Sequence, residues 1–187
     1  RNVLLSGEFA YDGSDKAIVA TSVYNTDNHS LTLNFRDIED DFMTITSFPG
    51  RGGEVGGSIF WNWNLRDINI NTYLDIYRER LNPNPEALDT YNVDFSTGAR
   101  ITLSETDRLT TSLYYIDTSG ELTPRNNIQS NVIYSKQFPG FNSRDITAFV
   151  GASQQRSRFE FSPSSEYDRY SMLLGVSVPL ARSLNYY

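Results

Sequence analysis

Residues 91–116 alternate apolar and polar side chains at every second position. The apolar positions are Tyr91, Val93, Phe95, Thr97, Ala99, Ile101 and Leu103 and, after a polar break at 104–107, Leu109, Thr111, Leu113 and Tyr115. Successive side chains of a β-strand point to opposite faces, so the pattern predicts two strands, each with one apolar and one polar face. The polar break joins them into an antiparallel hairpin. Each arm has about ten residues, which is the length a tilted strand needs to cross a bilayer.

The same alternation recurs along most of the chain. Further strands are expected at residues 3–11, 17–24, 31–35, 55–65, 68–76, 128–137, 146–161 and 170–178. No window keeps the i, i+3, i+4, i+7 spacing of an amphipathic helix. The pattern therefore predicts an all-β, antiparallel, up-and-down fold of about ten strands.

The expected connections fall into two length classes. The short ones are residues 25–30, 66–67, 104–107 and 180–183, together with a longer one at 138–145. The long, polar ones are residues 36–54, 81–90, 117–127 and 156–168. Short and long connections alternate, so in an up-and-down sheet all the long ones lie at the same end.

Composition narrows the choice of function. The net charge of −7 argues against a nucleic-acid partner, because phosphate contacts need clustered Lys and Arg. The chain has no Cys, which excludes disulfides and thiolate metal sites and fits an oxidising compartment. No apolar run approaches the twenty or so residues of a transmembrane helix. A membrane β-barrel stays possible, because its strands are apolar on one face only.

The alternation and the two classes of connection resemble bacterial outer-membrane β-barrels of the porin-like or export-pore type. The resemblance implies an up-and-down transmembrane barrel in the Gram-negative outer membrane, in contact with membrane lipid and lipopolysaccharide. It also implies a pore for transport or export of polar solutes or a hydrated polymer, with residues 36–54 as the gating loop. An oligomer or a periplasmic partner is possible, and no cofactor is expected.

The chain is expected to form one barrel domain, or a segment of a larger barrel, over residues 1–187. Barrels of this kind end in an aromatic residue that closes an alternating apolar strand. Tyr187 is aromatic, but Ser183 and Asn185, which share its face, are polar. We therefore expect the natural polypeptide to continue beyond residue 187.

The polar face of the strands is the candidate functional surface. Its members are Asn62, Asn64, Asn69, Asn71, Tyr73, Asp75, Tyr77, Glu79, Asn92, Asp94, Arg100, Thr110, Ser112, Tyr114, Gln129 and Asn131. If the apolar face meets lipid, these side chains line the lumen, and their amides and hydroxyls suit a water-filled passage. The alternative is a closed barrel of about eight to ten strands whose interior the same side chains fill.

Aromatic residues near the expected strand ends suit the girdles at the two membrane interfaces. They are Trp61, Trp63, Tyr91, Tyr114, Tyr115, Tyr134 and Tyr170. The alternative is that they are ordinary strand formers of a soluble sheet.

Candidate chemistry is sparse. Asp37, Glu39, Asp40 and Asp41 form an acidic cluster that offers oxygen ligands to Ca²⁺, although their spacing departs from an EF-hand loop and also fits a hydrated loop. His29 is the only histidine, and base catalysis needs a positioned partner. No nucleophile–base pair can be assembled, so an enzyme is not expected.

The alternatives to a pore are a structural or adhesive barrel that binds a partner through its long loops, and a soluble carbohydrate-binding module.

Overall fold

The computed structural model describes residues 2–11, 13–39, 42, 53–79, 90–120, 124–139, 145–160 and 162–178. Ten strands and one short 3₁₀-helix account for most of them. In chain order they are β1 (Asn2–Tyr11), β2 (Lys16–Asn25), β3 (His29–Ile38), β4 (Glu54–Asn64), β5 (Ile68–Glu79), β6 (Thr90–Thr102), β7 (Asp107–Ser119), β8 (Arg125–Phe138), β9 (Ile146–Phe159), η2 (Pro163–Ser165) and β10 (Tyr167–Ser177). The described residues hold no helix that is long and apolar enough to cross a membrane.

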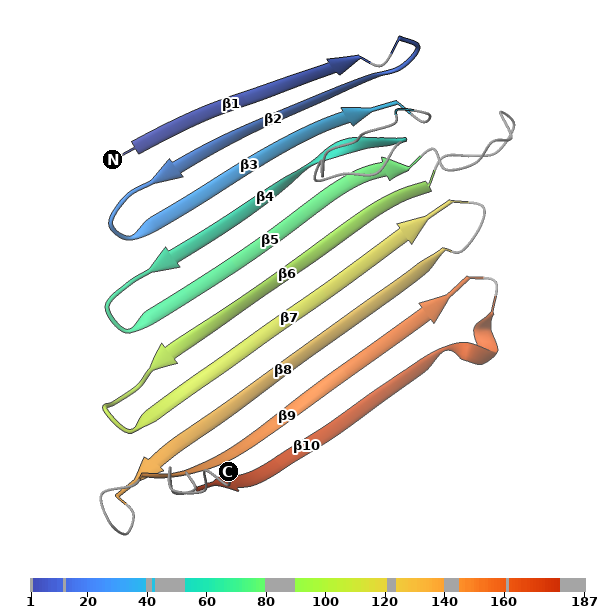
Figure 1. Ribbon diagram of the computed structural model, residues 1–187. Helices are drawn as coiled ribbons and strands as arrows, with labels where there is room; N and C mark the ends of the chain where they lie inside the picture. Colours follow the sequence, from blue (N-terminus) through green and yellow to red (C-terminus); the bar gives the residue numbers. More distant parts are fainter. Residues whose placement is uncertain are drawn as a thin grey trace, which may run out of the picture.

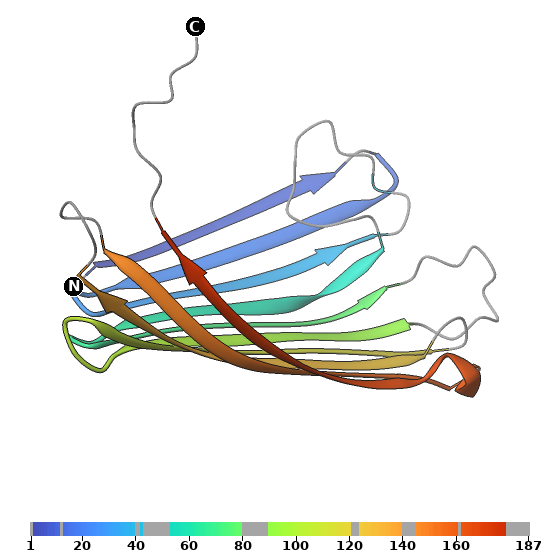
Figure 2. The same ribbon diagram turned by 90° about the horizontal axis from the view of Figure 1, so that it is seen from below.

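The strands form one antiparallel sheet in which each strand pairs with its neighbours in sequence, from β1 to β10 (Figure 1). The all-β, up-and-down prediction is therefore confirmed. The sheet is open, since β1 pairs only with β2 and β10 only with β9. It curls into a trough whose two sides end in these edge strands (Figure 2).

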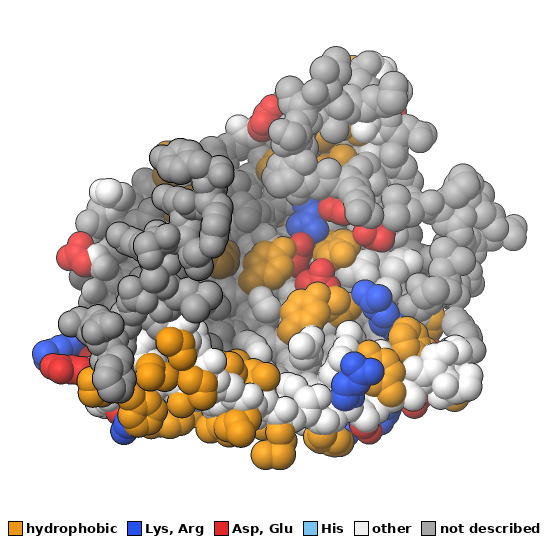
Figure 3. All heavy atoms as spheres, turned by 60° about the horizontal axis from the view of Figure 1, so that its bottom comes forward, with side chains coloured by type: hydrophobic (Ala, Val, Ile, Leu, Met, Phe, Trp, Pro, Cys, Tyr) orange, Lys and Arg blue, Asp and Glu red, His pale blue; other side chains and the backbone are white. Residues whose placement is uncertain are grey.

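The register gives the sheet two distinct faces. Asn34 pairs with Ser58, Ser58 with Asp75, and Asp75 with Asp94, so these four side chains share one face. We call this the inner face and the opposite one the outer face. Figure 3 looks into the hollow of the trough, where acidic and basic side chains lie next to hydrophobic-coloured ones, and further hydrophobic side chains gather along the rim below it.

In this sheet the buried side chains are mostly polar and many large apolar side chains are exposed, which is the reverse of a soluble sheet that packs on an apolar core. All the buried polar residues of the described part lie on the inner face, and they are Arg36, Glu54, Ser58, Asp75, Asn92 and Ser157. Most of the exposed large hydrophobic side chains in the strands lie on the outer face, among them Leu33, Ile59, Ile76, Val132 and Leu174. The only buried hydrophobic cluster among the described residues is small and joins Ala17, Ile38 and Phe42.

The connections differ from the sequence prediction in length. The expected loops at 117–127 and 156–168 are shorter, because β7 and β8 extend to leave residues 120–124, and β9 and β10 leave 160–166. Backbone pairing continues there through polar residues such as Asp117 and Asn126. The connections at 39–53 and 80–89 remain long, and both leave the same end of the sheet (Figure 1). The short connection expected at 180–183 lies outside the described residues.

Candidate functional site

The register places all sixteen residues of the predicted polar face on the inner face. Within β4, β5 and β6 they alternate with outer-face residues, and pairs such as Asn62 with Asn71 lie directly opposite each other. Pairing through β7 and β8 brings Ser112 and Asn131 to the same face. Amide groups join across strands, since Asn69 Nδ2 donates to Asn62 Oδ1 at 3.2 Å. That these residues line a lumen stays a prediction.

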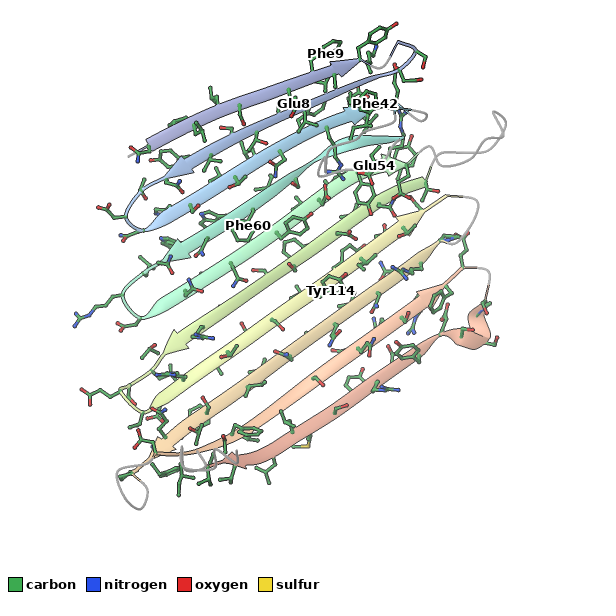
Figure 4. All side chains as sticks on the ribbon, in the orientation of Figure 1. Glu8, Phe9, Phe42, Glu54, Phe60 and Tyr114 are labelled. Carbon is green, nitrogen blue, oxygen red and sulfur yellow. The ribbon has the colours of Figure 1, made fainter. Side chains whose placement is uncertain are left out.

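Of the seven aromatic residues expected in the interfacial girdles, all but Tyr114 lie on the outer face. The girdles themselves stay a prediction. Tyr114 pairs with Ser96 and Gln129, which places it on the inner face (Figure 4). It could not serve an interfacial girdle, because a girdle faces lipid. Trp61 and Trp63 do lie on the outer face and stack with centroids 5.8 Å apart.

The strongest local feature is a buried ion cluster on the inner face, near the end of the sheet with the long connections. Arg36 Nε donates to Glu54 Oε2 at 2.8 Å, and its two terminal nitrogens donate to Asp75 Oδ1 and Oδ2 at 3.0 and 3.1 Å. The three side chains come from β3, β4 and β5. At most 11% of each side chain is exposed. Low exposure and bidentate geometry make such an arrangement rigid.

Two tyrosines of β5 complete the cluster. The Tyr73 hydroxyl donates to Asp75 Oδ2 at 3.1 Å, so this oxygen accepts from both Tyr73 and Arg36. The Arg36 guanidinium lies over the Tyr77 ring, 5.0 Å from its centroid. Arg36 is therefore fixed by two carboxylates and one aromatic face.

Gly56 makes this packing possible. It sits between Arg36 of β3 and Tyr77 of β5 in the pairing row across the inner face. A Cβ at this position would lie 2.4 Å from the Ile76 carbonyl oxygen and 2.5 Å from Tyr77 Cβ. Only a residue without a side chain lets the strands approach in this way.

A cavity of about 560 Å³ opens over the cluster. Its lining mixes carboxylates, hydroxyls, an amide and aromatic rings: Val19, Asn34, Phe35, Arg36, Glu54, Ser58, Tyr73, Asp75, Tyr77, Glu79 and Asp94. The volume lies in the range of small-molecule sites, roughly 300–1,000 Å³. The predicted polar face supplied Tyr73, Asp75, Tyr77, Glu79 and Asp94.

The predicted set of functional residues did not include Arg36, Glu54, Asn34 and Ser58, although the alternation already places Ser58 on the polar face with Asn62 and Asn64. The first two were assigned to the ends of an irregular stretch, whereas the structure places both in strands. A signal was present, because the alternation of Leu33 and Phe35 continues with polar residues between and after them. The prediction that 36–54 forms one loop is therefore wrong at its two ends.

The calcium prediction gains no support from the described residues. Asp37 lies on the outer face of β3, and Glu39 Oε1 is 3.4 Å from Lys16 Nζ, so Glu39 already has a cationic partner. Asp40 and Asp41 lie outside the described residues. Within the described ranges, no group of three or more His, Cys, Asp or Glu side chains could hold a metal ion.

His29 lies on the outer face at the opposite end of the sheet. Its ring stacks on Trp63 with a centroid separation of 5.5 Å. Among the described residues, no hydrogen bond or ion pair involves its side chain, so the arrangement gives it a packing role.

A polar network closes the turn between β6 and β7. The Asp107 carboxylate accepts hydrogen bonds from the hydroxyls of Ser104, Thr106 and Tyr134, and Lys136 Nζ lies 3.3 Å away. The bond from Ser104, followed by those from Tyr134 and Thr106, holds the pKa of Asp107 well below its usual value. The network fixes the turn that the sequence predicted at 104–107.

The chain matches no protein-family model, and it has no significant match among curated proteins or among solved structures. What it does must therefore be argued from its own residues.

Proposed function

We propose that this chain forms the wall, or part of the wall, of an outer-membrane β-barrel that serves as a pore for polar solutes or a hydrated polymer. The observation that carries the proposal is the reversed burial of the two faces. Large apolar side chains such as Ile76, 53% exposed, cover the outer face, whereas charged groups such as Arg36, 7% exposed, are enclosed on the inner face. Lipid outside and water inside would satisfy both faces.

A pore of this kind requires the free edges of β1 and β10 to be paired. Unpaired backbone N–H and C=O groups are too costly in hydrocarbon, so only closed sheets cross membranes. Closure of these ten strands on themselves gives a narrow interior that side chains largely fill, whereas additional strands widen the lumen. The amides and hydroxyls of the inner face would then meet the passing solute.

Conductance in planar lipid bilayers tests the proposal. The chain has no Cys, so a single cysteine can be introduced on either face for labelling. Ser112 and Leu113 are neighbours on β7, both exposed, on the inner and the outer face respectively. We expect a charged, membrane-impermeant thiol reagent to reduce the conductance of Ser112→Cys and to leave Leu113→Cys unchanged.

Two results would contradict a pore. One is a protein that stays monodisperse in buffer without detergent, because the outer face would then be covered by protein rather than lipid. The other is equal block of both cysteine variants, which would place both faces in water.

The second candidate function is a structural or adhesive barrel. It is favoured by the two longest connections, at 39–53 and 80–89, which leave the same end of the sheet and could present a common binding surface (Figure 1). Insertion into bilayers without any conductance would favour this candidate.

A further inference from the structure

The cavity on the inner face offers unused hydrogen-bond acceptors. Arg36 occupies one oxygen of Glu54 and, together with Tyr73, both oxygens of Asp75. Asp94 and Glu79 make no hydrogen bond or ion pair with any described residue. Four carboxylates and one guanidinium line the cavity, so its formal charge is 1 − 4 = −3. An anionic ligand would be repelled, and a ligand that donates hydrogen bonds would be favoured.

A hydrogen-bond donor without a partner lies beside these acceptors. Asn92 is only 7% exposed, and its Oδ1 accepts from the Thr118 hydroxyl at 3.0 Å, but its Nδ2 has no partner among the described residues. Asn92 faces inward on β6, directly opposite Tyr77 of β5, which lines the cavity. A buried amide N–H without an acceptor is unfavourable. This nitrogen is enclosed and Asn92 does not line the cavity, so the ligand contacts are assigned to the lining carboxylates and tyrosines instead.

The same wall carries aromatic surface. Tyr73 and Tyr77 both line the cavity, and Phe60 lies opposite Tyr73 on the inner face of β4 (Figure 4). Aromatic rings with a polar edge combine apolar contact with hydrogen bonding. A ligand that fits this wall therefore has a flat apolar side together with several hydroxyl groups that both donate and accept.

We propose that the cavity is a subsite for a sugar unit that carries no acidic group, either neutral or amino-bearing. Hydroxyl or ammonium hydrogens would be donated to Asp94 and Glu79, which both line the cavity. The ring face would lie on the tyrosine side of the cavity. The inference rests on the proposed function, because the sugar would be the polar solute or one unit of the hydrated polymer.

Calorimetric titration of the detergent-solubilised protein tests this inference with three tetrasaccharides: glucosamine, N-acetylglucosamine and galacturonate. We expect the first two to bind and the uronate to bind at least about tenfold more weakly, since one charge-assisted hydrogen bond lost corresponds to roughly that ratio. Equal binding of the uronate and the glucosamine oligomer would overturn the inference, as would the absence of binding by any of the three.

Two variants with matched controls locate the binding. Asp94→Asn keeps the shape of the side chain and should weaken glucosamine binding about tenfold, whereas Asp117→Asn on the outer face should not. Tyr77→Ala should weaken binding of both accepted sugars, whereas Tyr114→Ala, on the inner face but outside the cavity, should not. Circular dichroism of each variant verifies the strand content. Unchanged affinity in Asp94→Asn and Tyr77→Ala would overturn the assignment of the site.

Conductance measured on the same samples separates this inference from the proposed function. A protein that conducts ions but binds none of the sugars would refute the subsite and leave the pore intact. A protein that binds sugar at this cavity but never conducts would refute the pore and leave the subsite intact.

Discussion

Two neighbouring residues of β4 provide a direct measurement of what each face of the sheet contacts. Ile59 lies on the outer face and Phe60 on the inner face, and each is 41% exposed. Replacing either by Arg in water would remove a half-exposed apolar side chain at a cost of about 1 kcal/mol. In a membrane, Ile59→Arg would instead place a guanidinium in hydrocarbon at a cost of about 2–4 kcal/mol. Phe60→Arg would keep the smaller cost, because its charge would meet water.

Urea titrations in phospholipid vesicles, followed by tryptophan fluorescence, give the free energy of unfolding of each variant. The difference from the unsubstituted protein measures the cost of each Arg substitution. We expect Ile59→Arg to lose more stability than Phe60→Arg by about 1–3 kcal/mol, which is the difference between the two estimates above. Equal losses would refute the assignment of lipid to the outer face. A larger loss for Phe60→Arg would mean that the inner face is the one in the apolar environment.

Three further predictions concern the ion cluster, a glycine and a turn. Arg36→Met should destabilise the fold by about 3–5 kcal/mol in urea titrations, because it leaves two buried carboxylates uncompensated; a loss below about 1 kcal/mol would contradict the role given to the cluster. Gly56→Ala should lower the denaturation midpoint, whereas Gly7→Ala, whose Cβ would have no neighbour closer than 3.8 Å, should leave it unchanged. The depressed pKa of Asp107 stabilises the fold above its usual value of 3.8 and this contribution is lost as the pH falls below about 4. Asp107→Asn should therefore flatten the acid limb of a stability–pH profile, and an unchanged acid limb would show that the turn network does not contribute.

The faces of the strands could be predicted from the sequence because their signal is local. A period of two assigns each residue to one side without knowledge of its neighbours in space. It placed residues as distant as Asn62 and Asn131 on the same face, which the register confirms. The exception, Tyr114, was assigned to a girdle from its residue type, although its position in the alternation already placed it on the polar face.

The ends of the strands were less predictable, since pairing continues where the apolar pattern stops. On the outer face of β9, Arg156 and Arg158 replace apolar residues, and their guanidinium groups lie 2.9 Å from the Asp168 carboxylate of β10. Such cross-strand ion pairs allow charged residues within a ladder. If a strand is assumed to end at its first charged outer-face residue, the length of the connection that follows is therefore overestimated.

The ion cluster could not be predicted, because it depends on which residues the register brings together. Arg36, Glu54 and Asp75 come from three strands, and a shift of one residue in either pairing would turn a partner to the other face. Alternation alone assigns Arg36 to the polar face but does not identify its partners. Closure of the sheet is unpredictable for the same reason, since it depends on the partners of β1 and β10.

The register also separates the charges that hold the wall together from those that a solute would meet. Arg36 is held by three hydrogen bonds to its two carboxylates, so its charge is compensated within β3, β4 and β5. Asp94 lies in the same row as Asp75 and lines the cavity. Within the described residues it interacts with the charges of Asp75 and Arg125 but makes no hydrogen bond or close ion pair, so its oxygens remain available to the cavity. Stability and recognition should therefore respond to different substitutions. Arg36→Met should lower the free energy of unfolding, whereas Asp94→Asn should change sugar affinity with little loss of stability. If both variants changed both quantities together, the separation of roles within this row of side chains would be wrong.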